Sequence, residues 1–194
     1  MFEKLATFIK DTPLSTFNRK YYNGEDKINI IPLVDVLEPE EVETLNQVFD
    51  MSFKTEVEEL RSQCQIDMNN PAYKDLLKLI DVVEDKFETE RSDHIDARIW
   101  LDKEGFYFYP HVDNTEIHIS IQIYLDNNAP EWCGTSFFLN GLERGDNFVN
   151  ICTPPYKVGS GYLLLNTNTE VHGMINVVPE GCSRTSLYLN FKGK

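Results

Sequence analysis

Three side chains in the second half of the chain have the types and spacing of ligands for one metal ion. His111 and Asp113 are separated by one residue in the stretch FYFYPHVD, residues 106–113. If this stretch is a strand, both side chains point to the same face and can bind one ion, whereas Asp113 followed by Asn114 can also be a plain turn. His172 lies 59 residues beyond Asp113, after another strand-like stretch. Two imidazoles and one carboxylate form the facial triad that binds non-haem Fe(II) and leaves coordination positions open.

A fourth side chain, Arg184, could bind an anion. It begins the stretch RTSLYLNF, residues 184–191, in which Arg184, Ser186 and Tyr188 share one strand face. An arginine that faces inward needs an anion, and its planar guanidinium suits a carboxylate. The Ser186 hydroxyl can add a donor to the same anion. The alternative is a surface ion pair, which stabilises little, and the inward phase shared with Ser186 and Tyr188 argues against it.

A polar strand face could complete the site. The stretch IHISIQIYLD, residues 117–126, alternates isoleucines with four polar side chains: His118, Ser120, Gln122 and Tyr124. This face lies either toward solvent or toward a water-filled pocket. His118 has the simpler interpretation of an ordinary polar-face residue, and His94, at the start of another strand-like stretch, that of a structural residue.

Two amphipathic helices are predicted in the first half of the chain. Residues 38–50, EPEEVETLNQVFD, combine an early proline and acids suited to a helix start with apolar residues at helical spacing. Residues 70–90 begin with Asn70 as the N-cap and Pro71 in the first turn. Each helix has one apolar face, so each should pack against something flat, such as a sheet.

The hydrophobic period changes from helical to alternating near residue 92. Strand-like stretches separated by turn-forming residues then follow. Besides those described above, they are residues 94–102, 135–141, 147–152 and 161–166. This order predicts a single α+β domain over residues 1–194, with residues 1–91 as mainly helical support and residues 92–194 as a jelly-roll core. Residues 1–30 could cap the sheet or form a lid.

Composition restricts the partners and the compartment. A net charge of −14 repels phosphate backbones, so no nucleic-acid partner is expected. The four cysteines form no C-x-x-C pair and are expected to be free thiols in a reducing compartment. No stretch reaches the roughly 18 apolar residues of a membrane span. The start, MFEKLATFIKD, lacks the uninterrupted apolar core of a secretion signal. A soluble, cytoplasmic protein is therefore expected.

The motifs taken together resemble a known family. His-x-Asp, a distant His and Arg-x-Ser about a dozen residues later, with the stretches IYLDNN, CGTSFF and VGSGYLLLNTNTEVHGM, are similar to the 2-oxoglutarate and Fe(II) dependent oxygenases, in particular to the prolyl-hydroxylase-like branch. The resemblance covers about residues 30–192. A His-x-Asp pair alone often arises by chance, so the specificity lies in order, spacing and strand context together.

The resemblance implies a fold and a set of ligands. The fold is a double-stranded β-helix, a cupin-like jelly roll, with N-terminal helices packed on the major sheet. The residues that would hold Fe(II) are His111, Asp113 and His172. Arg184, assisted by Ser186 and Tyr124, would bind the distal carboxylate of the co-substrate 2-oxoglutarate.

The chain departs from the family pattern at one position and matches it in two possible ways at another. Many relatives have Gly-Gly before the Thr-x-Phe strand, where this chain has Cys133 and Gly134, so a different loop geometry is expected there. The tyrosine that relatives have shortly before His-x-Asp matches either Tyr107 or Tyr109.

The implied activity is hydroxylation of a substrate C–H bond, coupled to conversion of 2-oxoglutarate to succinate and carbon dioxide. The expected substrate is a protein or peptide residue such as proline, with a free amino acid or another small molecule second. The alternative from another class is a non-catalytic cupin-like module that binds a small molecule or peptide. A Zn(II) hydrolase ranks third, because the sequence offers no general-base motif such as H-E-x-x-H.

Overall fold

The structure, a computed structural model, describes residues 1–21, 24–52, 54–87, 92, 94–139, 149–166 and 170–192, without the side chains of residues 17–27 and 51. The ends of three predicted elements, at residues 88–90, 140–141 and 147–148, therefore lie outside the described residues.

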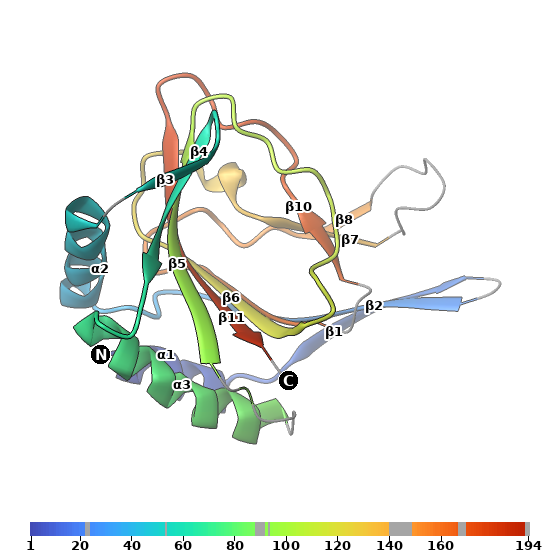
Figure 1. Cartoon of the computed structure of the whole chain (residues 1–194). Helices are drawn as coiled ribbons and strands as arrows, with labels where there is room; N and C mark the ends of the chain where they lie inside the picture. Colours follow the sequence, from blue (N-terminus) through green and yellow to red (C-terminus); the bar gives the residue numbers. More distant parts are fainter. Residues whose placement is uncertain are drawn as a thin grey trace.

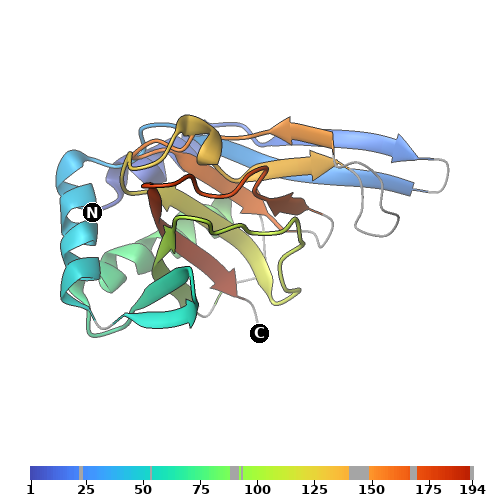
Figure 2. The same cartoon turned by 90° about the horizontal axis from the view of Figure 1, so that it is seen from above.

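Two antiparallel sheets form the body of the molecule, and helices pack on the outer face of the larger sheet (Figures 1 and 2). The major sheet has eight strands in the order β1-β2-β9-β6-β11-β5-β4-β3, and the minor sheet has three in the order β10-β7-β8. The helices are α1 Glu3–Asp11, α2 Pro39–Met51 and α3 Pro71–Phe87, with a short 3-10 turn at Glu131–Cys133. The strands are β1 Ser15–Tyr21, β2 Gly24–Leu33, β3 Thr55–Glu58, β4 Arg61–Ile66, β5 His94–Lys103, β6 Ile117–Tyr124, β7 Ser136–Leu139, β8 Val149–Cys152, β9 Gly161–Leu165, β10 Val171–Gly173 and β11 Ser183–Lys192.

The main core lies between the helices and the major sheet. The odd-numbered isoleucines of β6 and the apolar side chains of β11 are fully buried there, against the apolar faces of α1, α2 and α3. Since strand side chains alternate, the even-numbered residues of these strands face the space between the two sheets. The predicted α+β architecture, with helices packed on the major sheet, is confirmed.

Residues 1–66 also contribute four strands that the sequence analysis did not predict. Strands β1 and β2 pair with each other and extend the sheet beside β9, so these two strands form neither a cap nor a lid. The β3–β4 hairpin extends the opposite edge beside β5. β3 is short, polar and exposed along its whole length, so hydrophobic alternation does not reveal it. β2, by contrast, carries buried isoleucines that the sequence analysis did not assign to a strand.

The prediction that residues 106–113 form a strand is wrong. Only His111 forms a bridge, with His172, and the rest of this extended segment makes single hydrogen bonds to residues 174–178. Pro110 has no N–H to donate to a ladder. Phe106 and Phe108 are two residues apart, but the residues that donate hydrogen bonds to their carbonyl groups, Val178 and Met174, are four residues apart. The two segments therefore have no regular strand register.

None of the helices in the described part of the chain is long and apolar enough to cross a membrane.

Candidate metal centre

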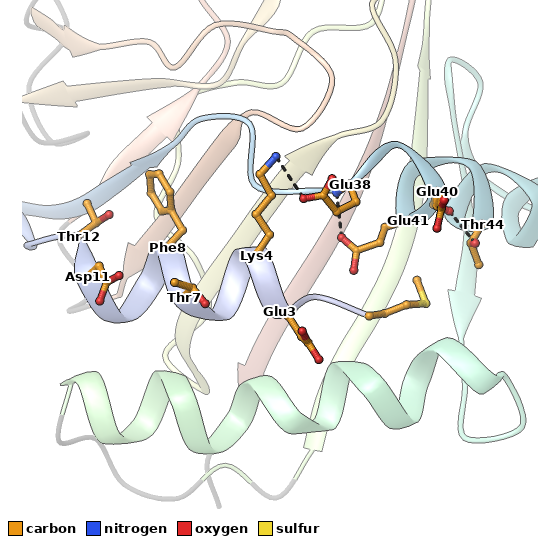
Figure 3. Close-up of a pocket in the computed structure, with 11 residues that line it drawn as sticks. Glu3, Lys4, Thr7, Phe8, Asp11, Thr12, Glu38, Glu40, Glu41 and Thr44 are labelled. Atoms are coloured by element: carbon orange, nitrogen blue, oxygen red, sulfur yellow. Dashed lines mark hydrogen bonds and ion pairs between the residues drawn. The ribbon is translucent and has the colours of Figure 1, made fainter.

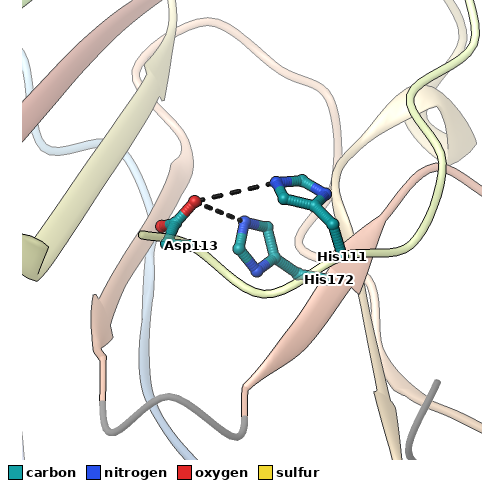
Figure 4. A group of neighbouring side chains, drawn as sticks. All are labelled: His111, Asp113 and His172. Carbon is teal, nitrogen blue, oxygen red and sulfur yellow. Dashed lines mark ion pairs between the residues drawn. The ribbon is translucent and has the colours of Figure 1, made fainter. Parts of the chain in front are cut away.

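The structure brings His111, Asp113 and His172 together, although they come from an irregular segment and from β10. The Nε2 atoms of His111 and His172 lie 3.7 and 3.6 Å from the Asp113 Oδ1 atom. One ligand atom from each residue lies within 4.8 Å of the other two. Figure 4 shows both imidazole rings turned toward the carboxylate. Donors bound to one ion at about 2.1 Å and right angles would be about 3 Å apart, so small side-chain shifts suffice to close the cluster around an ion.

Backbone carbonyl groups fix which nitrogen of each imidazole can bind a metal. His111 Nδ1 lies 2.9 Å from the Tyr109 carbonyl oxygen, and His172 Nδ1 lies 3.1 Å from the Glu170 carbonyl oxygen. A carbonyl oxygen only accepts hydrogen bonds, so each Nδ1 carries the proton and each Nε2 keeps a free electron pair. The donor set therefore fits a divalent transition metal.

The protonation states favour metal binding as well. Burial raises the pKa of Asp113, but its neighbours His111, His172 and Ser120 together outweigh burial, so the pKa is lowered. Ser120 Oγ donates to Asp113 Oδ2 over 2.9 Å, which leaves Oδ1 facing the histidines. Burial lowers the pKa of His172, which keeps its imidazole neutral. A carboxylate and neutral imidazoles are the protonation states that coordinate a cation.

The cluster lies on the wall of a cavity of about 240 Å³ between the two sheets. Gln122 and Thr135 line it, and Thr135 Oγ1 donates to Gln122 Oε1 over 2.8 Å. The buried polar face of β6 therefore contributes to a pocket rather than to the solvent-exposed surface. Tyr162 and Tyr188 also line the cavity, and burial raises the pKa of both, so their hydroxyls stay protonated.

Arg184 lines the same cavity and is only 2% exposed. Its Nε atom lies 3.8 Å from Asp102 Oδ2. Its Nε and Nη1 groups have no hydrogen-bond acceptor among the described residues. Buried N–H donors of a charged group that lack acceptors destabilise the folded protein. A small anion in the cavity would supply the missing acceptors.

The other two residues predicted to contact the anion are buried but are not among the residues that line the cavity. Ser186 Oγ accepts a hydrogen bond from Gln122 Nε2 over 3.0 Å, so it orients a side chain of the wall. Tyr124 lies with its ring centroid 5.7 Å from the Arg184 guanidinium carbon, and its hydroxyl accepts a bond from the Thr135 N–H over 2.7 Å.

Neither tyrosine considered before His111 lines the cavity. Tyr109 is 76% exposed, and Tyr107 packs beside Phe106 in a small separate cluster. Phe106 and Phe108 line the cavity instead, and the Phe108 ring lies 4.2 Å from the His111 ring.

The loop before β7 contains a close backbone approach. A Cβ atom at Gly134 would lie 1.9 Å from the Pro154 carbonyl oxygen, so only glycine fits there. Cys133, which stands where many relatives have the first glycine of Gly-Gly, packs its side chain in a buried cluster with Tyr124 and Tyr156.

Sequence reasoning missed two functional candidates in the cavity, Arg61 and Asp102. Arg61 comes from the unpredicted strand β4. Asp102 and Trp100 share one face of β5, two residues apart, which alternation in residues 94–102 could have indicated.

A larger hollow, of about 840 Å³, lies elsewhere, between α1 and the start of α2 (Figure 3). Two of its acidic groups, those of Glu38 and Glu41, have structural partners. Lys4 Nζ pairs with Asp35 and Glu38, and Glu41 accepts bonds from the Phe2 and Glu38 N–H groups at the helix starts. The hollow is open and none of the three clustered ligands lines it, so we assign the chemistry to the smaller cavity.

No family profile and no curated protein sequence matches the chain. Solved structures do match it. A Pseudomonas putida prolyl-4-hydroxylase aligns with a TM-score of 0.63 and 15% identity over 85% of this chain and 92% of that one. HygX from Streptomyces hygroscopicus, with nickel, 2-oxoglutarate and hygromycin B bound, aligns with a TM-score of 0.62 and 14% identity over 100% of this chain and 88% of that one. A viral collagen prolyl hydroxylase from Paramecium bursaria Chlorella virus-1 aligns with a TM-score of 0.57 and 15% identity over 83% of this chain and 94% of that one.

The chain therefore has the double-stranded β-helix fold of the 2-oxoglutarate and Fe(II) oxygenases, several of its structural neighbours being prolyl hydroxylases. The fold predicted from the resemblance is confirmed.

Proposed function

We propose that the protein is an Fe(II)- and 2-oxoglutarate-dependent dioxygenase that hydroxylates a C–H bond and releases succinate and carbon dioxide. One observation carries the proposal. Two free imidazole Nε2 atoms and a carboxylate oxygen converge on the wall of a cavity whose lining also includes a buried arginine with unsatisfied donors. A cation site and an anion site in one cavity suit a metal and a dicarboxylate.

The residues have separate roles in this proposal. His111, Asp113 and His172 hold Fe(II), which supplies the oxygen chemistry when it is bound. Arg184 pairs with the distal carboxylate of 2-oxoglutarate. Ser186 and Tyr124 assist indirectly, because they accept hydrogen bonds from two residues of the cavity wall. Ser186 accepts one from Gln122, and Tyr124 accepts one from Thr135. The surrounding apolar side chains exclude water from the reacting atoms.

A protein or peptide residue such as proline is the proposed substrate, and a small molecule is the second candidate. Prolyl hydroxylases among the structural neighbours support the first choice. HygX, which was solved with hygromycin B bound, supports the second. Succinate release stimulated by a panel of proline peptides and free amino acids would separate them.

The test uses the purified protein without oxygen. Fe(II) and 2-oxoglutarate together should produce a weak visible charge-transfer band, and His172→Ala should abolish it because one of three protein ligands is lost. His118→Ala is the matched control, since His118 lies outside the cluster, and it should retain the band.

Two results would decide against the enzyme. Absence of the band in the wild-type protein would reject the chelate. If 2-oxoglutarate binds with the same affinity with and without metal, and no succinate forms in air, the non-catalytic binding module is favoured.

A further inference from the structure

Three charged side chains lie in one row beside the proposed anion site. Asp102 of β5 is directly opposite Arg61 of β4 on one side and Arg184 of β11 on the other. The row is therefore cation, anion, cation across three neighbouring strands. The proposed function uses Arg184 and gives no role to Asp102 or Arg61.

Asp102 is shared unequally between the two arginines. Its Oδ1 atom lies 2.9 Å from Arg61 Nε, whereas its Oδ2 atom lies 3.8 Å from Arg184 Nε. Asp102 and Arg184 are almost completely buried, so their charges interact strongly. Burial raises the pKa of Asp102, while Arg61 and Arg184 oppose that shift. A cation on each side favours the charged form of the carboxylate.

Aromatic rings hold Arg61 in this position. Its guanidinium carbon lies 4.0 Å from the Trp100 ring centroid, 4.8 Å from that of Phe106 and 4.9 Å from that of Phe108. Such cation–π contacts stabilise the charge where water is excluded. Arg61 is thus a fixed cation, attached to the β3–β4 hairpin at the sheet edge.

The arrangement matters for an incoming carboxylate. A buried aspartate beside Arg184 competes with any second carboxylate for the same guanidinium and also repels it. With Arg61 present, the row carries a net charge of +1. Without Arg61 the net charge is zero, and Asp102 is free to turn fully toward Arg184.

We propose that Arg61 is a positioning residue for the co-substrate, because it holds Asp102 and so keeps Arg184 available to the distal carboxylate of 2-oxoglutarate. This inference rests on the proposed function. Asp102 in turn offsets the repulsion between two guanidinium groups in the ligand-free protein.

The test measures 2-oxoglutarate affinity by isothermal titration calorimetry of the Mn(II)-loaded protein, which requires no turnover. Arg61→Met should weaken binding about tenfold, the scale of coupling between contacting charged residues. Adding Asp102→Asn to this variant should restore binding to within about threefold of wild type, because the competing charge is gone. A purely structural role for Arg61 would not be rescued by removing a second polar partner.

Lys103→Met is the control. Lys103 is a partly exposed cation of β5 that pairs with Glu56 over 3.4 Å and does not line the cavity, so its loss should change the affinity less than about twofold.

Asp102→Asn alone provides a second check if Arg61→Met fails to fold. It should bind 2-oxoglutarate at least as tightly as wild type while its ligand-free melting temperature falls.

Unchanged affinity in Arg61→Met, no rescue in the double variant, or weaker binding by Asp102→Asn would each overturn the inference and leave the proposed function intact. Failure of the wild-type protein to bind 2-oxoglutarate would overturn both.

Discussion

Three aspartates in the cavity wall show how partners decide the charge of a buried carboxylate. Burial raises the pKa of each, yet the pKa of Asp96 and of Asp113 is lowered and that of Asp102 is raised. Asp96 accepts two hydrogen bonds from Arg98, at 2.8 and 2.9 Å, and pairs with Lys192. Asp102 is more completely buried than Asp96, and its ion pairs with two arginines do not offset that burial. Desolvation therefore decides the direction of the shift where burial is complete, and polar partners decide it where burial is partial.

Asp96 gives a prediction for stability against pH. Its folded-state pKa is below the ordinary value of 3.8, so it stabilises the fold at pH values above that value, and this contribution disappears as the pH falls through the folded-state pKa. Asp96→Asn should lower the unfolding free energy by about 1–3 kcal/mol at pH 7. The difference from wild type should shrink steadily below about pH 4, as measured by urea unfolding.

Asp50→Asn serves as the comparison, because the Asp50 side chain is 78% exposed and its pair with Lys54 spans 4.0 Å. It should be close to wild type at both pH values. A pH-independent loss in Asp96→Asn would contradict the argument.

Among the secondary-structure elements, β10 is the one on which the metal cluster most depends. It has three residues, pairs with β7, and carries His172 at its centre. Mutual backbone hydrogen bonds of 2.9 Å between His111 and His172 hold the two ligand segments together. Gly173 permits this contact, since a Cβ atom there would lie 2.8 Å from the Pro110 Cα atom.

Gly173→Ala should therefore separate the two segments and weaken Mn(II) binding about tenfold, the scale seen when groups that orient metal ligands are disturbed. Calorimetric titration with Mn(II) would measure it. Gly181→Ala is a useful control, because Gly181 has a φ of +72° but open space around it. That variant should lose stability through backbone strain and keep its metal affinity. Equal effects of the two substitutions would argue against a role for the Gly173 contact.

For the whole molecule, the cluster joins parts that are distant in the chain. His172 belongs to the minor sheet, His111 and Asp113 to the connecting segment, and Ser120 anchors Asp113 to the major sheet. A bound ion would cross-link the two layers and stabilise the folded state over the unfolded one.

Mn(II) at about 100 times its dissociation constant should add about 2.7 kcal/mol, or about 5–10 °C in melting temperature. A chelator should reverse the shift. His172→Ala should show no shift, and His118→Ala should show the full one. A shift of equal size in His172→Ala would mean that the ion binds elsewhere.

The sequence alone determined the features that depend on local periodicity and order. The alternation in β6 and β11 separates core isoleucines and leucines from the polar side chains of the cavity. The two amphipathic helices follow from apolar spacing, and His111, Asp113 and His172 from their order in a strand-rich half. Such patterns are readable because each records the period of a single element.

Only the tertiary structure decided what depends on contacts between distant segments. Residues 106–113 are extended but form no regular strand, because their partner at residues 174–178 has a different spacing. Arg61 reaches the cavity on a polar hairpin that no hydrophobic pattern marks, and it meets Asp102 and Arg184 only across strand register. Pairing register and burial are properties of the assembled sheet, so no single stretch of sequence contains them.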